Sequence, residues 1–196
     1  MTVSPDDLDA LTNHLADTLA PATTRDWSAH PGTGDWTAWH TAEHLGDCLL
    51  SYAAQLVAQP DGRYVRFEAF VDKDAGAAEV LEFAVTGARI LASTVRTAGP
   101  EVRAYHPTGL ADPAGFAGMG CVEVLVHGHD IAQGLGLALD PPREACARVL
   151  SRMFPHRTEQ LGEVGPWQGL LWATNRISLP GKGQQTGWRW RGASPV

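Results

Sequence analysis

Three side chains near residue 40 have the spacing of a metal-binding helix. His40, Glu43 and His44 form the pattern H-x-x-E-H, with two histidines four residues apart and a carboxylate between them. Inverted zinc proteases use this pattern on a helix, where both imidazoles bind zinc and the carboxylate acts as general base. Metal-dependent peptide hydrolysis is therefore one hypothesis for this chain.

A second set of polar residues lies in the segment GMGCVEVLVHGHDIAQGLG. Glu123 and His127 are four residues apart and Asp130 follows three later, so a helix places all three on one face. Apolar residues share that face, and a buried carboxylate or imidazole is costly unless a partner satisfies it. A divalent metal ion would satisfy both groups. A plain Glu–His hydrogen bond would also do so, and the spacing alone does not separate the two.

His44 supplies a ligand that the second set lacks. It lies next to Leu45 on its helix, so it can approach Glu123 and His127 from a facing helix. In the protease interpretation, His40 and His44 both bind the metal; in the other, His44 binds it together with Glu123 and His127. We favour the second, because no edge strand that would align a peptide is evident near this segment.

The elements that must position these residues are helices. Apolar residues recur at helical spacing in five segments, separated by breaks rich in Gly and Pro. We expect helices over about 5–20, 38–58, 75–97 and 113–135, and a fifth that begins with Asp140 as N-cap and Pro141 in its first turn. This pattern predicts an all-α fold, an antiparallel four-helix bundle with an extra C-terminal helix.

The composition of the chain changes from Gly165 onwards. The segment is rich in tryptophan, contains a PGKG turn and ends in the alternating sequence Trp188-Arg189-Trp190. We expect a short helix or turn and then a small β-ribbon. The chain therefore divides into a bundle over residues 1–164 and a Trp-rich tail over residues 165–196 that packs on it.

Composition and charge argue against several classes of function. The 196 residues are 44% hydrophobic and 19% charged, with a net charge of −7, as in an ordinary globular protein. An acidic chain without a basic patch favours neither nucleic acid nor an anionic membrane surface as partner. No apolar run approaches the ~20 residues that span a bilayer.

The three cysteines, odd in number and widely spaced, favour reduced thiols. With no signal-peptide pattern at the start, we expect a cytoplasmic protein.

Taken together, these motifs resemble a known family. The sequences EHLGD, EVLVHGHDIA and LLWATNRISLP are similar to those of the mycothiol-dependent maleylpyruvate isomerase family, which belongs to the DinB/YfiT-like group of four-helix metalloenzymes. The resemblance extends roughly over residues 8–139. It implies a DinB-like bundle that holds a divalent metal ion, usually zinc, with His44, Glu123 and His127 as ligands.

The sequence also departs from the family pattern. Asp35 is an extra residue in the Gly-Trp-Thr motif before the second helix, His129 stands where an aromatic residue is usual, and Asn175 replaces a glycine. Full-length isomerases of the family carry a second, α/β domain after the bundle, for which residues 166–196 are too few. We therefore expect thiol chemistry on another small electrophile rather than maleylpyruvate isomerisation.

The resemblance implies a mechanism that depends on a thiol. Zinc with three protein ligands keeps an open position, and a low-molecular-weight thiol such as mycothiol loses its proton there. We expect Asp130 to accept a hydrogen bond from a ligand imidazole or else to form a salt bridge at the helix end. His40 is the candidate general acid–base, or else an ordinary histidine at the start of its helix. Trp36 and Trp39 either pack the end of the bundle or form a wall of the thiol pocket. The partners would be the thiol, a small-molecule substrate and, by family analogy, a second copy in a homodimer.

Two other functions stay open at this stage. The same centre would serve a hydrolase that activates water instead of a thiol. A bundle that keeps the fold and binds a small ligand without chemistry would also retain these residues.

Overall fold

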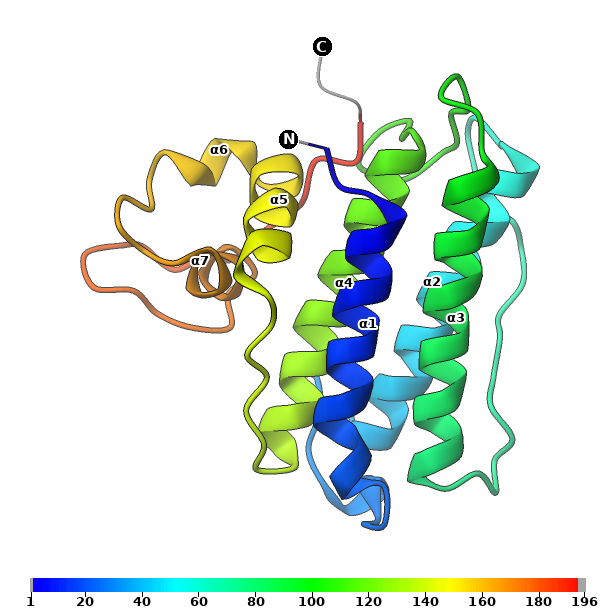
Figure 1. Cartoon of the computed structure of the whole chain (residues 1–196), viewed down its shortest axis with the longest axis vertical. Coiled ribbons are helices and arrows are strands. Elements are labelled where there is room, and N and C mark those ends of the chain that lie inside the picture. The colour runs from blue at the N-terminus through cyan, green and yellow to red at the C-terminus, as the bar shows by residue number, and fades with distance from the viewer. Residues whose placement is uncertain (1, 194–196) are drawn as a thin grey trace.

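Four long helices form a bundle in the computed structural model, which describes residues 2–193 (Figure 1). They are α1 (Pro5–Leu19), α2 (Ala38–Ala58), α3 (Ala77–Thr97) and α4 (Pro113–Gly134). α1 packs against α3 and α4, and α2 packs against the same two helices, so α1 and α2 lie diagonally across the bundle. The all-α fold expected from the sequence is confirmed.

The helices do not simply alternate in direction. α1 and α3 run antiparallel, as the ion pair between Asp6 and Arg96 at opposite ends of their sequences shows. α2 and α3 run in the same direction, because Trp39 at the start of α2 donates a hydrogen bond to the carbonyl of Ala75, just before α3. Residues 59–76 therefore return along the outside of the bundle from the end of α2 to the start of α3 (Figure 1).

Side chains cap the N-termini of three bundle helices. Ser4 accepts a hydrogen bond from the amide of Asp7, and the Asp7 carboxylate accepts one from the amide of Ser4, which together form a capping box. Thr37 caps α2 by accepting from the amide of His40. Asp112 caps α4 by accepting from the amide of Gly115. Pro5 lies in the first turn of α1, where a proline costs no hydrogen bond of the helix.

α4 is the central helix, buried on nearly all sides. Its glycines allow the neighbouring helices to come close: a Cβ on Gly120 would lie 2.7 Å from Leu91, and one on Gly128 would lie 2.6 Å from Leu15. Glu123 and His127 on this helix are therefore buried against other helices rather than exposed to water. Neither α4 nor any other helix within residues 2–193 is long and apolar enough to cross a membrane.

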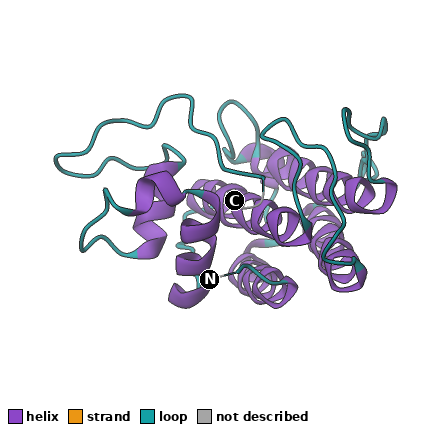
Figure 2. Cartoon of the chain, turned by 90° about the horizontal axis from the view of Figure 1, so that it is seen from above, coloured by secondary structure: helices purple, strands orange, loops and turns teal. Residues whose placement is uncertain are grey.

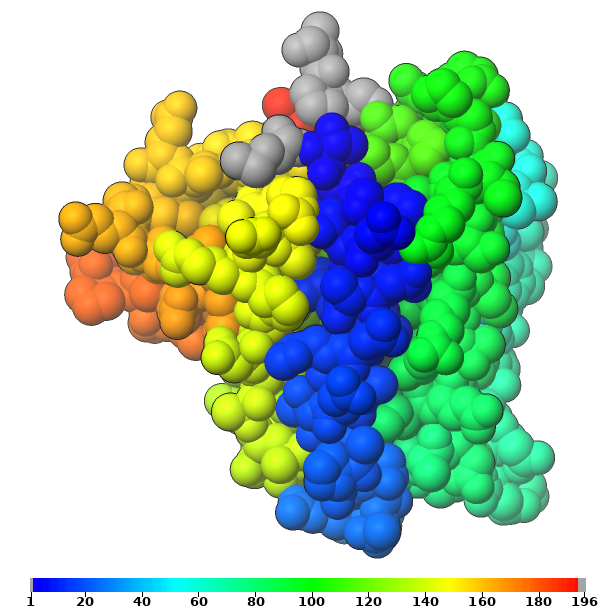
Figure 3. All heavy atoms as spheres, in the orientation of Figure 1, coloured from blue at the N-terminus to red at the C-terminus, as the bar shows by residue number. Residues whose placement is uncertain are grey.

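Three short helices stand beside the bundle. They are α5 (Arg143–Met153), α6 (Pro155–Thr158) and α7 (Pro166–Ala173). α5 packs on α4, and α7 packs on α5. From above, they lie to one side of the long helices (Figure 2). The space-filling view shows them as a lobe that continues the bundle surface (Figure 3).

α5 begins later than the sequence suggests. Its N-cap is Pro142 rather than Asp140. A residue that precedes proline is disfavoured in the helical conformation, so Pro141, which precedes Pro142, stays outside the helix. The paired prolines therefore delay the helix to Arg143.

The β-ribbon expected in the Trp-rich tail is wrong. After α7, residues 174–193 contain no strand and form a single isolated bridge, between Ala193 and Ala111. The buried guanidinium of Arg152 instead donates hydrogen bonds to the carbonyls of Arg191 (2.8 Å) and Gly192 (3.2 Å). Because these carbonyls bond to a helix side chain and not to a second strand, the segment is an ordered loop.

Candidate functional site

The carboxylate and imidazole of α4 meet inside the bundle. Oε2 of Glu123 lies 3.0 Å from Nε2 of His127, and both side chains are buried. The Tyr52 hydroxyl, from α2, donates a hydrogen bond to Oε1 of Glu123 at 2.8 Å. Burial by itself raises the pKa of Glu123, but the hydrogen bonds from His127 and Tyr52 outweigh it and lower the pKa below its usual value. Glu123 is therefore an ionised carboxylate in the interior.

His44 approaches this pair from α2. Its ring centroid lies 5.1 Å from that of His127, with the two rings nearly perpendicular. Burial, together with the nearby His127, lowers the pKa of His44, so its imidazole is neutral at pH 7 and has a lone pair on one ring nitrogen. The structure brings together the three side chains that the sequence had grouped.

Cys48 lies one helical turn after His44. Its Sγ is 3.3 Å from Nε2 of His44. Burial and the negative charges of Glu123 and Asp47 raise the pKa of the Cys48 thiol, which therefore stays protonated. Within residues 2–193, cysteines 48, 121 and 146 form no disulfide, in line with the expectation of free thiols.

A chain of hydrogen bonds runs behind His127. Thr33 donates its hydroxyl hydrogen to Oδ2 of Asp130 at 2.6 Å, and its oxygen lies 2.8 Å from Nδ1 of His127. Arg176, just after α7, pairs with the same carboxylate at 2.9 Å. Asp130 thus acts on the imidazole through Thr33, and it also forms a salt bridge. The salt bridge considered for Asp130 from the sequence is present. The direct hydrogen bond from an imidazole is not, because Thr33 lies between Asp130 and His127.

The direction of these hydrogen bonds assigns the tautomer of His127. The Asp130 carboxylate only accepts, so the single hydroxyl hydrogen of Thr33 is used there, and Nδ1 of His127 must donate to the Thr33 oxygen. Nε2 of a neutral His127 then presents a lone pair to Oε2 of Glu123, 3.0 Å away. Two acceptors at this distance need a positive ion between them: either the proton with which His127 donates its hydrogen bond to Glu123, or a metal ion in place of that proton.

The donor atoms are nevertheless not arranged as a finished metal cage. In the part of the chain that the structure describes, no three His, Cys, Asp or Glu side chains are gathered so that they could hold a metal ion as they stand. Glu123 and His127 are paired with each other, and Nε2 of His44 faces Cys48. The neighbours of the three candidate ligands satisfy them in this arrangement.

A small pocket opens onto His44 from the surface. It has a volume of about 160 Å³, and its lining includes Trp36, His40 and Phe70. Trp36 packs against both His40 and His44, with ring centroids 4.9 and 4.8 Å away. Glu43, which also lines the pocket, lies 3.5 Å from Nδ1 of the half-exposed His40. His40 is thus at the pocket mouth, whereas His44 is at its inner end.

Trp39 and His129 lie away from this pocket. Trp39 is partly buried and donates its hydrogen bond to the Ala75 carbonyl. His129 is half-buried and packs on Trp167, with ring centroids 5.7 Å apart. The tail covers this face of α4, which sequence spacing did not indicate.

The sequence analysis missed two residues that contact the candidate ligands. Tyr52 looked like one more apolar position of α2, and Thr33 lies in a turn with no recognisable motif. The helical periodicity of α2 places Tyr52 two turns after His44 on the same face. A hydroxyl at that position was the feature of the sequence that pointed to a contact with the candidate ligands. Thr33 gave none, because its partners are more than 90 residues away in the chain.

The fold and the site define a DinB-like helical bundle with an inward-facing carboxylate and two imidazoles. Residues 8–132 match the model of the mycothiol maleylpyruvate isomerase N-terminal domain family. The match covers more than half of the chain, which therefore belongs to this family. No curated protein and no solved structure matches the chain. The family name associates its members with a thiol-dependent, isomerase-type reaction on a small molecule.

Proposed function

We propose that this protein is a divalent-metal-dependent enzyme that uses a low-molecular-weight thiol of the mycothiol type. It would transfer the thiol to a small electrophilic metabolite, or use it to assist an isomerisation. One observation carries the proposal: His44 lies beside the Glu123–His127 pair, where a neutral His127 with its proton on Nδ1 would leave two acceptors facing each other. A metal ion at that point would satisfy both.

The chemistry of the three side chains fits zinc. Two neutral imidazoles and one carboxylate are zinc ligands, and three protein ligands leave an open position. The Thr33–Asp130–Arg176 chain supplies the outer hydrogen bonds that orient a ligand histidine. When bound, a divalent metal lowers the pKa of a thiol that enters its open position.

Other residues of the protein would bind the substrate, transfer a proton and hold Glu123 in place. Trp36 and Phe70 offer aromatic walls for a small substrate at the pocket mouth. His40 directs Nδ1 toward Glu43, which leaves Nε2 to exchange a proton with the substrate. Tyr52 keeps its hydrogen bond on Glu123 and so holds that carboxylate in place.

Metal content tests the proposal directly. We expect the purified protein to carry about one divalent metal ion per chain, and His44→Ala and His127→Ala to lose it. His129→Ala is the matched control, because it changes a histidine on the same helix that packs on Trp167. His40→Ala should also retain the metal. Loss of metal in His40→Ala would revive the protease-type ligand set, and full metal in His127→Ala would overturn the proposed centre.

Thiol dependence separates the proposed function from its alternatives. Turnover of electrophilic substrates should require both metal and added thiol. Turnover of an ester or amide without thiol, abolished by a chelator, would instead identify a hydrolase. Native mass spectrometry of the same samples would report the thiol adduct and show whether the chain forms the homodimer suggested by family analogy.

A further inference from the structure

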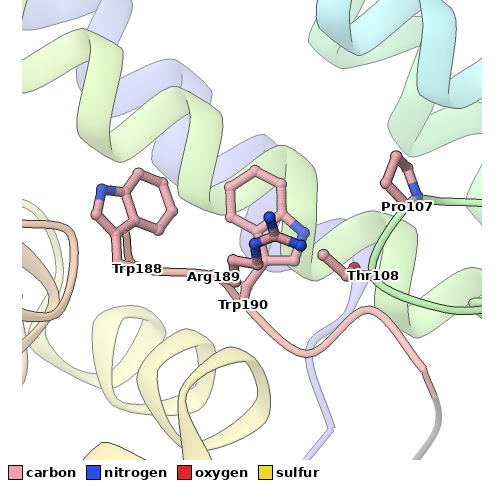
Figure 4. A pocket seen from close by; sticks show the side chains of 5 residues that line it. All are labelled: Pro107, Thr108, Trp188, Arg189 and Trp190. Atoms are coloured by element: carbon pink, nitrogen blue, oxygen red, sulfur yellow. The ribbon is translucent and has the colours of Figure 1, made fainter. Parts of the chain in front are cut away.

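A groove lies between the loop after α3 and the C-terminal tail. It consists of two adjoining cavities of about 280 and 290 Å³ that share Thr108, Arg189 and Trp190. Trp188 completes the first, and His156 and Arg191 belong to the second. Figure 4 shows Trp188, Arg189 and Trp190 on one stretch of the tail, across from Thr108. These tail residues lie outside the segment that matches the family.

Two indole rings form an angled wall of this groove. The rings of Trp188 and Trp190 are 5.6 Å apart and inclined at 49°, and both side chains are partly buried against the core. Trp190 also packs on His106, with ring centroids 5.8 Å apart. Its Nε1 is a buried donor without a hydrogen-bond acceptor in the described part of the chain. The wall therefore offers an aromatic surface to the groove.

The groove is positively charged, unlike the chain as a whole. Arg189 and Arg191 are exposed, and within residues 2–193 neither guanidinium forms an ion pair. Among residues 2–193, no carboxylate lines either cavity. The net charge of the chain is −7, so two unpaired arginines beside two tryptophans are a local exception.

The groove is held in shape by contacts behind it. The guanidinium of Arg152 holds the carbonyls of Arg191 and Gly192, and the amide of Arg191 donates to the carbonyl of Met153 at 2.8 Å. On the opposite side, the Thr108 hydroxyl is 2.7 Å from Nδ1 of His106. A preformed site of this kind loses little conformational freedom when a ligand binds.

We propose that this groove binds a small organic anion that carries a ring. Its phosphate or carboxylate would lie on the guanidinium groups of Arg189 and Arg191, and its ring would pack on Trp188 and Trp190. The site is separate from the candidate metal centre, because the rings of His106 and Tyr52 stand between Trp190 and Glu123.

Calorimetric titration of the full chain with phenyl phosphate tests this proposal. Phenol, which lacks the charge, and inorganic phosphate, which lacks the ring, are the two ligand controls. We expect phenyl phosphate to bind about tenfold more tightly than either, and the double variant Arg189→Gln, Arg191→Gln to lose about tenfold of that affinity. Arg143→Gln, an exposed arginine outside the groove, is the control variant.

Three outcomes would overturn the proposal. Phenol binding as tightly as phenyl phosphate would show that the groove is only an apolar surface. Unchanged affinity in the double variant, with far-UV circular dichroism like that of the wild type, would exclude the arginines as the anion site. Binding that disappears when the metal is chelated would assign the ligand to the metal centre instead. Retained binding after chelation supports the groove whether or not the proposed function holds.

Discussion

The hydroxyl of Thr33 stands between two groups with opposite hydrogen-bonding needs. Asp130 can only accept, so it takes the hydroxyl hydrogen, and His127 must then donate from Nδ1. One small side chain in a turn thereby decides which nitrogen of a helix residue faces Glu123. A hydroxyl is sufficient for this role, whereas an aliphatic side chain of the same shape is not.

Replacement of Thr33 by Val should weaken metal binding about 10- to 100-fold, because the outer hydrogen bond that orients His127 is lost. Competition with a chromophoric chelator would measure the change. Thr33→Ser should restore wild-type affinity, and Thr24→Val, at an exposed threonine in the same connection, should leave it unaltered. Wild-type affinity in Thr33→Val would show that the hydrogen-bond chain does not act on the metal.

Asn175 illustrates how a departure from the family sequence can preserve the backbone. Its φ is +60°, in the left-handed region, where glycine is usual and asparagine is the best-tolerated alternative. By the sequence resemblance a glycine is usual at this position, and both glycine and asparagine tolerate a left-handed turn. The next residue is Arg176, which this turn directs onto Asp130.

At the scale of elements, α2 and α3 make the closest helix contact near the candidate site. Gly87 faces the backbone of Gly46: a Cβ on Gly87 would lie 2.8 Å from the Gly46 carbonyl oxygen. A Cβ on Gly46 would in turn lie 2.4 Å from the ring of Phe83. This contact fixes the position of α2, the helix that carries His44 and Tyr52.

Gly87→Ala should therefore destabilise the protein by about 1–2 kcal/mol. The added methyl group meets backbone that cannot move aside, which outweighs the roughly 1 kcal/mol gained from alanine's higher helix propensity. Urea denaturation followed by circular dichroism would measure the change. Gly62→Ala, where a Cβ would meet nothing within 4 Å, is the control and should have almost no effect. A stabilised Gly87→Ala variant would contradict this close approach.

At the scale of the whole molecule, ion pairs tie the C-terminal segments to the bundle. Arg148 of α5 donates two hydrogen bonds to Asp7 of α1, at 3.0 and 2.6 Å. Arg176 holds Asp130 at the end of α4. The second pair links the chain after α7 to the candidate site, so the C-terminal part supports the geometry behind His127.

The Asp7 pair should make stability depend on pH. Burial alone raises the pKa of Asp7, but the hydrogen bonds from Arg148 and Ser4 outweigh it, so the folded-state pKa lies below 3.8. The contribution is complete above about pH 3.8 and is lost as the pH falls through the folded pKa. At neutral pH, Asp7→Asn should be less stable by about 2 kcal/mol.

Denaturation of both proteins between pH 2 and pH 7 would test this dependence. The difference between wild type and Asp7→Asn should shrink toward zero at the acid end. Asp17→Asn, at an exposed position of the same helix, should parallel the wild type at every pH. A difference that stays constant down to pH 2 would rule out the charge of Asp7 as its source.

The sequence by itself determined the helices and the three candidate ligands. Caps such as Ser4, breaks at Gly and Pro, and apolar periodicity act within a few residues, so they can be read from the order of the chain. The same local geometry placed Glu123, His127 and Asp130 on one face of α4. The family motifs linked them to His44 on another helix.

Only the tertiary structure decided the rest. The parallel run of α2 and α3, the loop conformation of the tail and the contacts of Thr33 and Arg176 depend on packing between segments that are far apart in sequence. Such contacts cost chain entropy to form and have no periodic signature. The proton on His127 is the clearest case, because it is set by the Thr33 hydroxyl, 94 residues away in the chain.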